Sequence, residues 1–253
     1  MLLTEAAVTW QLLLEPAGRS GAENMAVDAA LLAEAGRTAR AFLRLYRFAP
    51  PCLSLGRNEP AARYDRAVIA RLGIEVVRRP TGGRAVWHEH EVTYAVAAPV
   101  AAFGGLRRGY RAIQSRLAAA LRTLGVGAQL APDGPVARPT NRLASCFATP
   151  VGGEVVVAGR KVIGSAQVRE GSAFLQHGSI LLAGSQEIVR LVSGERVAGS
   201  GESTLTAVLG RVVSFDEVAS AIVDAWWGMA SLTARPPDRL TAAFRDPAWT
   251  WRR

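Results

Sequence analysis

Hydrophobic and polar residues alternate in several short stretches of the chain, and stretches with helical spacing lie between them. The segment AFLRLYRF alternates strictly and predicts a half-buried strand over residues 41–48. Further strands are predicted at residues 8–14, 74–78 and 173–182, and residues 154–167 are predicted to form two strands around Ala158-Gly159. Residues 81–84 (TGGR) form a turn, and residues 85–100 are predicted to form a hairpin around HEHE.

Helices are predicted where apolar residues recur every three or four positions. Residues 20–36 and 109–124 show this spacing, residues 60–72 form another predicted helix, and a short helix and tail end the chain. Ser214 and Glu217 form a capping box that opens a helix through Trp227. Because hairpins and helices mix without regular β-α-β alternation, the sequence predicts an α+β fold with a central, mainly antiparallel sheet flanked by helices.

The composition indicates a globular protein of the cytoplasm. Hydrophobic residues make up 49% of the 253 residues, enough for a large core, yet no apolar stretch is long enough to cross a membrane. The first residues lack the basic segment of a secretory signal. Two cysteines, Cys52 and Cys146, do not make a disulfide framework in a chain of this length. We therefore expect a cytoplasmic protein with free thiols and without a membrane partner.

The formal net charge of +9 indicates acidic partners. The arginines are spread along the chain without a basic stripe interleaved with aromatic residues, which argues against a nucleic-acid partner. An acidic protein partner explains the charge equally well. Of the 30 basic residues only Lys161 is a lysine. Lysine supplies a compact ammonium group with a tunable pKa, which arginine cannot, so Lys161 is a candidate functional residue, although a stray lysine is the alternative.

Three segments carry candidate chemistry. Cys146 follows a long Pro/Gly-rich loop at residues 131–141 and has small neighbours, so it is a candidate nucleophile, although a buried apolar cysteine is the commoner case. Cys52, by contrast, is expected to be structural. In GRKVIGSAQ, Lys161 precedes a side-chain-poor stretch on which a ligand could lie against the backbone. The third segment, RRPTGGRAVWHEHEVTY, combines arginines, a glycine turn and two histidines.

A metal site is not expected from these histidines. His88 and His90, two positions apart, are predicted to share one strand face, and His177 is the third histidine of the chain. No carboxylate at ligand spacing completes such a set, so the sequence predicts neither a metal nor another cofactor.

Taken together and in this order, three blocks resemble the catalytic domain of biotin/lipoate protein ligases: RRPTGGRAVWHEHEVTYAV, SCFATPVGGEVVVAGRKVIGSAQ and AFLQHGSILL. The segment GAENMAVDAALL, residues 21–32, also matches that family's early helix, and the resemblance covers roughly residues 20–230. Within the family the chain looks most like the octanoyl-carrier-protein:protein octanoyltransferases of the Bacillus type. Glu89 departs from the family, which more often has Asp at this position.

The resemblance implies a single catalytic domain over residues 1–253, built around an acyl-binding tunnel. It implies that Cys146 forms an acyl thioester and that Lys161 lowers the thiol pKa or positions the acyl carbonyl group. The donor would be octanoyl-acyl carrier protein, and the acceptor a lipoyl-domain protein such as the glycine cleavage H protein or a 2-oxoacid dehydrogenase E2 subunit. The residues implied to bind the acyl group and the partner are Arg79, Thr81, Gly82, Gly83, His88, Gly164, Ser165, Ala166 and His177.

Two related activities stay open as alternatives: an ATP-dependent lipoate or octanoate ligase, and an amidotransferase that moves octanoyl between lipoyl domains. Three features favour the transferase. A cysteine precedes the lysine hairpin, the turn reads GGR where ligases usually have a third glycine, and the chain stops without the accessory domain common in bacterial ligases.

Overall fold

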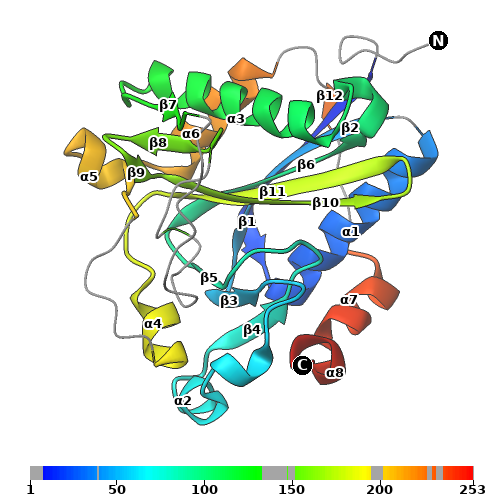
Figure 1. The fold of residues 1–253 in the computed structure, drawn as a ribbon, viewed down its shortest axis with the longest axis vertical. Helices are drawn as coiled ribbons and strands as arrows, with labels where there is room; N and C mark the ends of the chain where they lie inside the picture. Colours follow the sequence, from blue (N-terminus) through cyan, green and yellow to red (C-terminus); the bar gives the residue numbers. More distant parts are fainter. Residues whose placement is uncertain are drawn as a thin grey trace.

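The computed structural model describes residues 8–38, 40–132, 147, 152–194, 202–226, 230–231 and 236–252. Its centre is a six-stranded sheet in the order β10-β11-β6-β2-β1-β12 (Figure 1). These strands are β1 (Trp10–Arg19), β2 (Ala41–Phe48), β6 (Glu91–Pro99), β10 (Ile163–Glu170), β11 (Ala173–Leu181) and β12 (Ala230–Ser231). Strands β10, β11, β6 and β2 pair antiparallel, whereas β1 pairs in parallel with β2 and β12. The predicted α+β fold with a mainly antiparallel central sheet is therefore confirmed.

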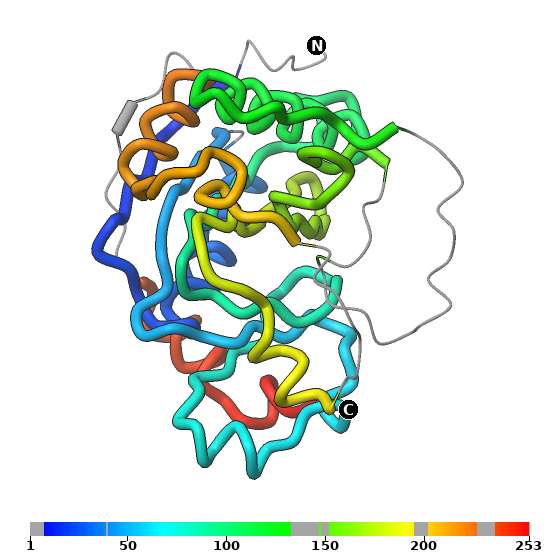
Figure 2. The backbone as a smooth tube through the Cα atoms, turned by 90° about the vertical axis from the view of Figure 1, so that its left-hand side faces the viewer, coloured from blue at the N-terminus to red at the C-terminus, as the bar shows by residue number. Residues whose placement is uncertain are grey.

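Helices cover both faces of this sheet (Figure 1). On one face lie α1 (Gly21–Thr38) and α7 (Asp238–Arg245), and on the other lie α3 (Leu106–Thr123) and α6 (Phe215–Ala225). The side view in Figure 2 shows α3 and α6 at one end of the molecule and the C-terminal helices at the opposite end. Helix α1 begins with a capping box, in which Glu23 Oε2 accepts hydrogen bonds from the Ser20 backbone N–H at 3.1 Å and hydroxyl at 2.6 Å.

Strand β2 shows how the sequence pattern fits between two layers of helices. Phe42 and Tyr46 point to the α1 side, and Leu43 and Leu45 point to the α3 and α6 side. The prediction of a half-buried strand is wrong, because Arg44 in the middle of β2 is 0% exposed. Its charge is paired inside the protein, so a strand that alternates like a surface strand lies in the core.

Two smaller sheets complete the framework. The first has the order β4-β3-β5 with β3 (Cys52–Leu55), β4 (Glu75–Arg78) and β5 (Val86–His88), and the second has the order β7-β8-β9 with β7 (Gln129–Leu130), β8 (Val155–Val157) and β9 (Arg160–Lys161). The hairpin predicted for residues 85–100 is wrong: β5 pairs with β3, whereas β6 pairs with β2 and β11. The predicted strands around Ala158-Gly159 are β8 and β9, which pair antiparallel.

Shorter helices surround the small sheets. They are η2 (Ala61–Arg63), α2 (Arg66–Arg71), η3 (Val100–Phe103), α4 (Glu187–Ser193), α5 (Leu205–Leu209) and α8 (Pro247–Thr250). The single helix predicted over residues 60–72 is wrong, because Asp65 caps α2 by accepting from the N–H groups of Ala67 and Val68. Ser214 caps α6 as predicted, and α6 ends at Ala225. Among the described residues, no helix combines the length and apolar character needed to cross a bilayer.

Candidate active site

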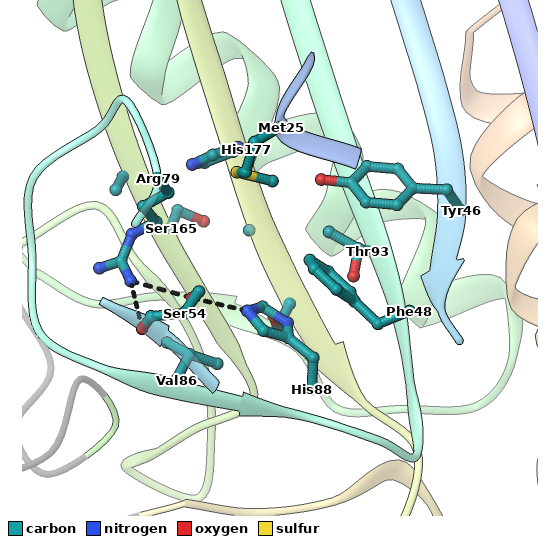
Figure 3. Close-up of a pocket in the computed structure, with 14 residues that line it drawn as sticks. Met25, Tyr46, Phe48, Ser54, Arg79, Val86, His88, Thr93, Ser165 and His177 are labelled. Atoms are coloured by element: carbon teal, nitrogen blue, oxygen red, sulfur yellow. Dashed lines mark hydrogen bonds between the residues drawn. The ribbon is translucent and has the colours of Figure 1, made fainter. Parts of the chain in front are cut away.

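A pocket opens on the α1 side of the central sheet, where β6, β10 and β11 meet the sheet formed by β3, β4 and β5 (Figure 3). The space between its atoms, including the open mouth, is about 360 Å³. Six of the residues implicated by the sequence line this pocket: Arg79, His88, Gly164, Ser165, Ala166 and His177. Segments far apart in the chain therefore meet at one site.

His177 lies in the middle of a buried chain of hydrogen bonds beside the pocket. Its Nδ1 is 2.8 Å from Asp28 Oδ2, and its Nε2 is 2.6 Å from Thr81 Oγ1. Asp28 also accepts hydrogen bonds from Arg44 Nη1 at 2.8 Å and from the Tyr46 hydroxyl at 2.9 Å. Burial lowers the pKa of His177, against the opposing effect of Asp28. The imidazole is therefore neutral, so that Nδ1–H donates to Asp28 and Nε2 accepts from Thr81.

Asp28 keeps its negative charge although it is 0% exposed. Burial alone raises the pKa of this carboxyl group, but the hydrogen bond from His177 and the charge of Arg44 outweigh burial and hold the pKa below its ordinary value. Arg44 in turn donates to Glu15 Oε2 at 2.6 Å. A buried network of charges that pair with one another thus supports the pocket wall.

His88 has a similar pair of partners on the other side of the pocket. Its Nδ1 is 2.6 Å from Glu91 Oε1, and its Nε2 is 2.7 Å from Ser54 Oγ. The Phe48 ring stacks on the imidazole at a centroid distance of 4.0 Å. Ser54 also accepts a hydrogen bond from Arg79 Nη1 at 3.1 Å, and Figure 3 shows the three side chains of Arg79, Ser54 and His88 in line.

The segment from Arg79 to Arg84 folds around the Arg79 guanidinium group. The five N–H groups of this side chain donate to Ser54 O and Oγ, to Gly82 O twice, and to Arg84 O, at 2.6 to 3.2 Å. Gly83 has a φ of +88°, and a Cβ at Gly56 would lie 1.9 Å from Gly83 O. Arg79 and the glycines therefore shape the turn, whereas Thr81, Gly82 and Gly83 do not line the pocket.

Lys161 is 2% exposed and lies behind the pocket wall. Its Nζ is 2.7 Å from Glu154 Oε1 and 5.8 Å from the centre of the Phe147 ring. The same ring lies against Gly164, because a Cβ there would be 2.8 Å from Phe147 Cζ. Lys161 is therefore a buried, ion-paired residue, and the alternative of a solvated lysine at a strand end is wrong.

Cys146 lies outside the described residues. Cys52 is 0% exposed, and burial raises the pKa of its thiol well above the ordinary value, as fits the structural role predicted for it. The prediction that His88 and His90 share a strand face is wrong. Strand β5 ends at His88, and the side chain of His90 is 59% exposed. In the described part of the chain, no three His, Cys, Asp or Glu side chains are grouped as metal ligands.

Sequence reasoning missed four polar residues of the site: Asp28, Ser54, Glu91 and Glu154. A signal was available for Glu91, which follows His88 by three residues, and for Glu154, which immediately precedes β8 and comes within 2.7 Å of Lys161 when β8 pairs with β9. Asp28 and Ser54 have no such signal, because their partners lie far away in the sequence.

Comparison with known proteins agrees with the fold. A family model for the lipoyl protein ligase A/B catalytic domain matches residues 20–227. The match spans the helix, the turn and the strands that build the pocket. The chain therefore belongs to the lipoyl protein ligase A/B catalytic domain family.

Several relatives in sequence are named octanoyltransferase LipM. Octanoyltransferase LipM from Carboxydothermus hydrogenoformans is 42% identical over 179 residues, which cover 69% of this chain and 65%, just under two thirds, of that protein. Octanoyltransferase LipM from Kyrpidia tusciae is 38% identical over 261 residues, covering 95% of this chain and 93% of that protein. The crystal structure of lipoate-protein ligase A bound with ATP has a TM-score of 0.77 at 20% identity and covers 96% of this chain and 98% of that chain, a likeness of fold alone.

Proposed function

We propose that this chain is an octanoyltransferase of protein lipoylation. It takes octanoyl from an acyl carrier protein as a thioester on Cys146 and passes it to the lysine of a lipoyl-domain protein, such as the glycine cleavage H protein or a 2-oxoacid dehydrogenase E2 subunit. The relatives named octanoyltransferase LipM support octanoyl transfer and a lipoyl-domain acceptor. The proposal adds two details to this: the acyl carrier protein as the donor and the thioester on Cys146 as the intermediate.

The observation that carries the proposal is the position of Phe147, the residue after Cys146 in the chain. Its ring packs against Gly164 of the pocket wall and lies 5.8 Å from Lys161 Nζ. The sequence block with the proposed nucleophile, the block with the lysine and the pocket thus meet at one side chain. The proposed substrate-binding residues are those implicated by the sequence, with Arg79, Thr81, Gly82 and Gly83 acting through the shape of the turn.

The two half-reactions balance without a cofactor. The Cys146 thiolate attacks the carbonyl carbon of the octanoyl thioester, a new C–S bond forms, and the carrier's thiolate leaves and takes up a proton. The acceptor amine then attacks the enzyme thioester, loses its proton and releases the Cys146 thiolate. Because Lys161 is paired with Glu154, its charge is partly neutralised, so a role in positioning fits better than a large lowering of the thiol pKa.

An octanoyl chain supplies its own binding energy when it is buried. Six methylene groups at about 0.8 kcal/mol each give roughly 5 kcal/mol. Met25, Phe48 and Val86 provide apolar surface in the pocket for this purpose. Shorter acyl chains bury fewer methylene groups and therefore bind more weakly than octanoyl.

The arginines of α3 support an acidic donor protein. Helix α3 has no acidic residue in its first turn, and Arg107, Arg108 and Arg111 on it are exposed. The stem of Arg111 reaches the turn that precedes Glu154, because a Cβ at Gly153 would lie 3.8 Å from Arg111 Cγ. The stem of Arg111 therefore lies beside the residue that precedes Glu154, and the positive charge of α3 would steer an acidic carrier towards this part of the molecule. Transfer rates that do not fall between low and high salt would contradict this steering.

The test is the intact mass of the protein after mixing with octanoyl-acyl carrier protein. We expect one octanoyl adduct on Cys146, its loss on addition of a lipoyl domain, and no adduct in Cys146→Ala. A Cys52→Ala protein is the matched control and should acylate normally, since Cys52 is buried. Full transfer activity in Cys146→Ala would overturn the proposal, and product formed from free octanoate and ATP would favour a ligase.

A further inference from the structure

Ser54, His88 and Glu91 form a hydrogen-bonded series that the proposed transfer reaction does not use. The Ser54 hydroxyl lies 2.7 Å from His88 Nε2, and His88 Nδ1 lies 2.6 Å from Glu91 Oε1. A nucleophile next to a base, with a third group orienting that base, is the arrangement of an activated serine. Ser54 and His88 both line the pocket, whereas Glu91 lies behind them.

The hydrogen-bond partners of His88 indicate which of its ring nitrogens carries the proton. Glu91 Oε1 accepts from the Thr93 hydroxyl as well as from His88, and Glu91 Oε2 has no hydrogen-bond partner among the described residues. His88 Nδ1 is also 3.2 Å from Ser179 Oγ, but its shorter contact is the one to Glu91. In the tautomer that donates from Nδ1 to Glu91, Nε2 accepts from Ser54. The Phe48 ring stacked on the imidazole fixes its plane. His88 is therefore oriented as a base towards Ser54.

Arg79 places positive charge beside the serine oxygen. Arg79 Nη1 donates to Ser54 Oγ at 3.1 Å and to Ser54 O at 3.0 Å. A hydroxyl oxygen has two lone pairs, so one lone pair of Oγ remains for an incoming carbon atom. The guanidinium charge stabilises the oxygen as it loses its proton.

The second histidine of the pocket, His177, has a similar set of partners. Asp28, His177 and Thr81 repeat the order of carboxylate, imidazole and hydroxyl, at 2.8 and 2.6 Å. Ser54 and Thr81 are both 0% exposed, but Ser54 lines the pocket and Thr81 does not. Of these two hydroxyl groups only that of Ser54 therefore borders the pocket.

We propose that Ser54 is a second acyl acceptor in this pocket, which His88 and Glu91 activate towards esters and thioesters of medium-chain fatty acids. Ser54 Oγ attacks the acyl carbon while its proton passes to His88 Nε2, and the leaving alcohol or thiol departs with that proton. Water then attacks the serine ester through the same base, which releases the fatty acid and restores the Ser54 hydroxyl. The chain thereby has a hydrolytic activity that needs neither Cys146 nor an acceptor lysine.

The experiment uses the full-length Cys146→Ala protein, which lacks the proposed thiol nucleophile, and p-nitrophenyl octanoate as the probe. We expect a burst of p-nitrophenol and an octanoyl adduct that peptide mass spectrometry maps to Ser54. The pocket serine Ser165, whose hydroxyl group pairs with Tyr94 and Gln114, serves as the internal control and should stay unmodified. Mapping on this protein requires no change at Ser54 and so does not depend on the folding of a Ser54 variant.

Two variants test the role of the base. His88→Gln should lower the burst rate by about 10²- to 10³-fold, in the range of general-base catalysis, and Glu91→Gln should lower it less. Ser172→Ala, at an exposed serine in the β10–β11 turn, is the matched control and should leave the rate unchanged. An adduct absent from Ser54, or one formed at the same rate in His88→Gln, overturns the inference. Either result leaves the Cys146 test with the carrier protein intact, because the two tests use different donors and different nucleophiles.

Discussion

Replacing Asp28 with Asn tests the buried charge network that supports the pocket. Asn keeps the volume of the side chain but removes the negative charge. It leaves Arg44 Nη1, the Tyr46 hydroxyl and His177 Nδ1, at 2.8, 2.9 and 2.8 Å, facing a neutral amide that cannot accept from all three as a carboxylate does. Both Asp28 and Arg44 are 0% exposed, so water cannot replace the lost partner without local opening.

The cost follows from the burial of these charges. Breaking a buried ion pair by removing one partner costs about 3–5 kcal/mol. Arg44 keeps Glu15 at 2.6 Å, so we expect the lower half of this range, about 3 kcal/mol of the free energy of unfolding. With a urea dependence of roughly 1–3 kcal/mol per molar, the unfolding midpoint should fall by at least about 1 M.

The pKa of Asp28 determines how the stability difference between the two proteins changes with pH. The folded-state pKa of Asp28 lies below its unfolded value of roughly 3.9. The stability linked to its charge is therefore present above about pH 4 and is lost as the pH falls through the folded pKa. Urea unfolding of the wild type and Asp28→Asn should show the full difference at pH 7 and a smaller one below pH 4. The control, Asp224→Asn at an exposed position of α6, should change stability by less than about 0.5 kcal/mol. A difference below about 1 kcal/mol at pH 7 would refute the reasoning.

Three further predictions concern other buried groups. Burial raises the pKa of Tyr94 to about 12, so the wild type should lose up to about 3 kcal/mol between pH 10 and 12 as the unfolded state ionises, and Tyr94→Phe should lose that much less in the same titration. Glu154→Gln should cost about 3–5 kcal/mol, most of which the double change with Lys161→Met should restore in a denaturation cycle. Gly164→Ala should cost about 1–3 kcal/mol in thermal unfolding, because its Cβ would lie 2.8 Å from Phe147, whereas Gly36→Ala, with no atom closer than 3.8 Å, should cost nothing.

The elements of the fold follow from local patterns, and their assembly does not. Residues 41–48 read as a strand because their alternation is strict, yet the same alternation cannot show that both faces are covered. Arginine is normally a surface residue, and the charges of Asp28 on α1 and Glu15 on β1 make the burial of Arg44 tolerable. The hairpin at residues 85–100 failed for a similar reason, because the choice of partner strand depends on contacts far away in the sequence.

The sequence also predicted only part of the candidate site. Arg79, His88, Gly164 to Ala166 and His177 were found through the family resemblance, and all of them line one pocket. Ser54 was not found, because a serine in a short apolar strand has nothing in its neighbourhood to mark it. Its role becomes recognisable only from the pairing of β3 with β5. This pairing places Ser54 opposite Val86 and within hydrogen-bond distance of His88.

The polar lining of the pocket is compatible with a fatty acyl ligand because its polar groups already have partners. Ser165 binds the Tyr94 hydroxyl at 2.7 Å and the Gln114 amide at 2.8 Å, and the five donors of Arg79 are taken by backbone and serine oxygens. A hydrocarbon chain that enters such a pocket displaces water without leaving a buried donor or acceptor unpaired, which would cost about 1–3 kcal/mol for each group. In the proposed function, selectivity for an apolar chain would thus come from the saturation of these polar groups as much as from the apolar side chains of Met25 and Phe48.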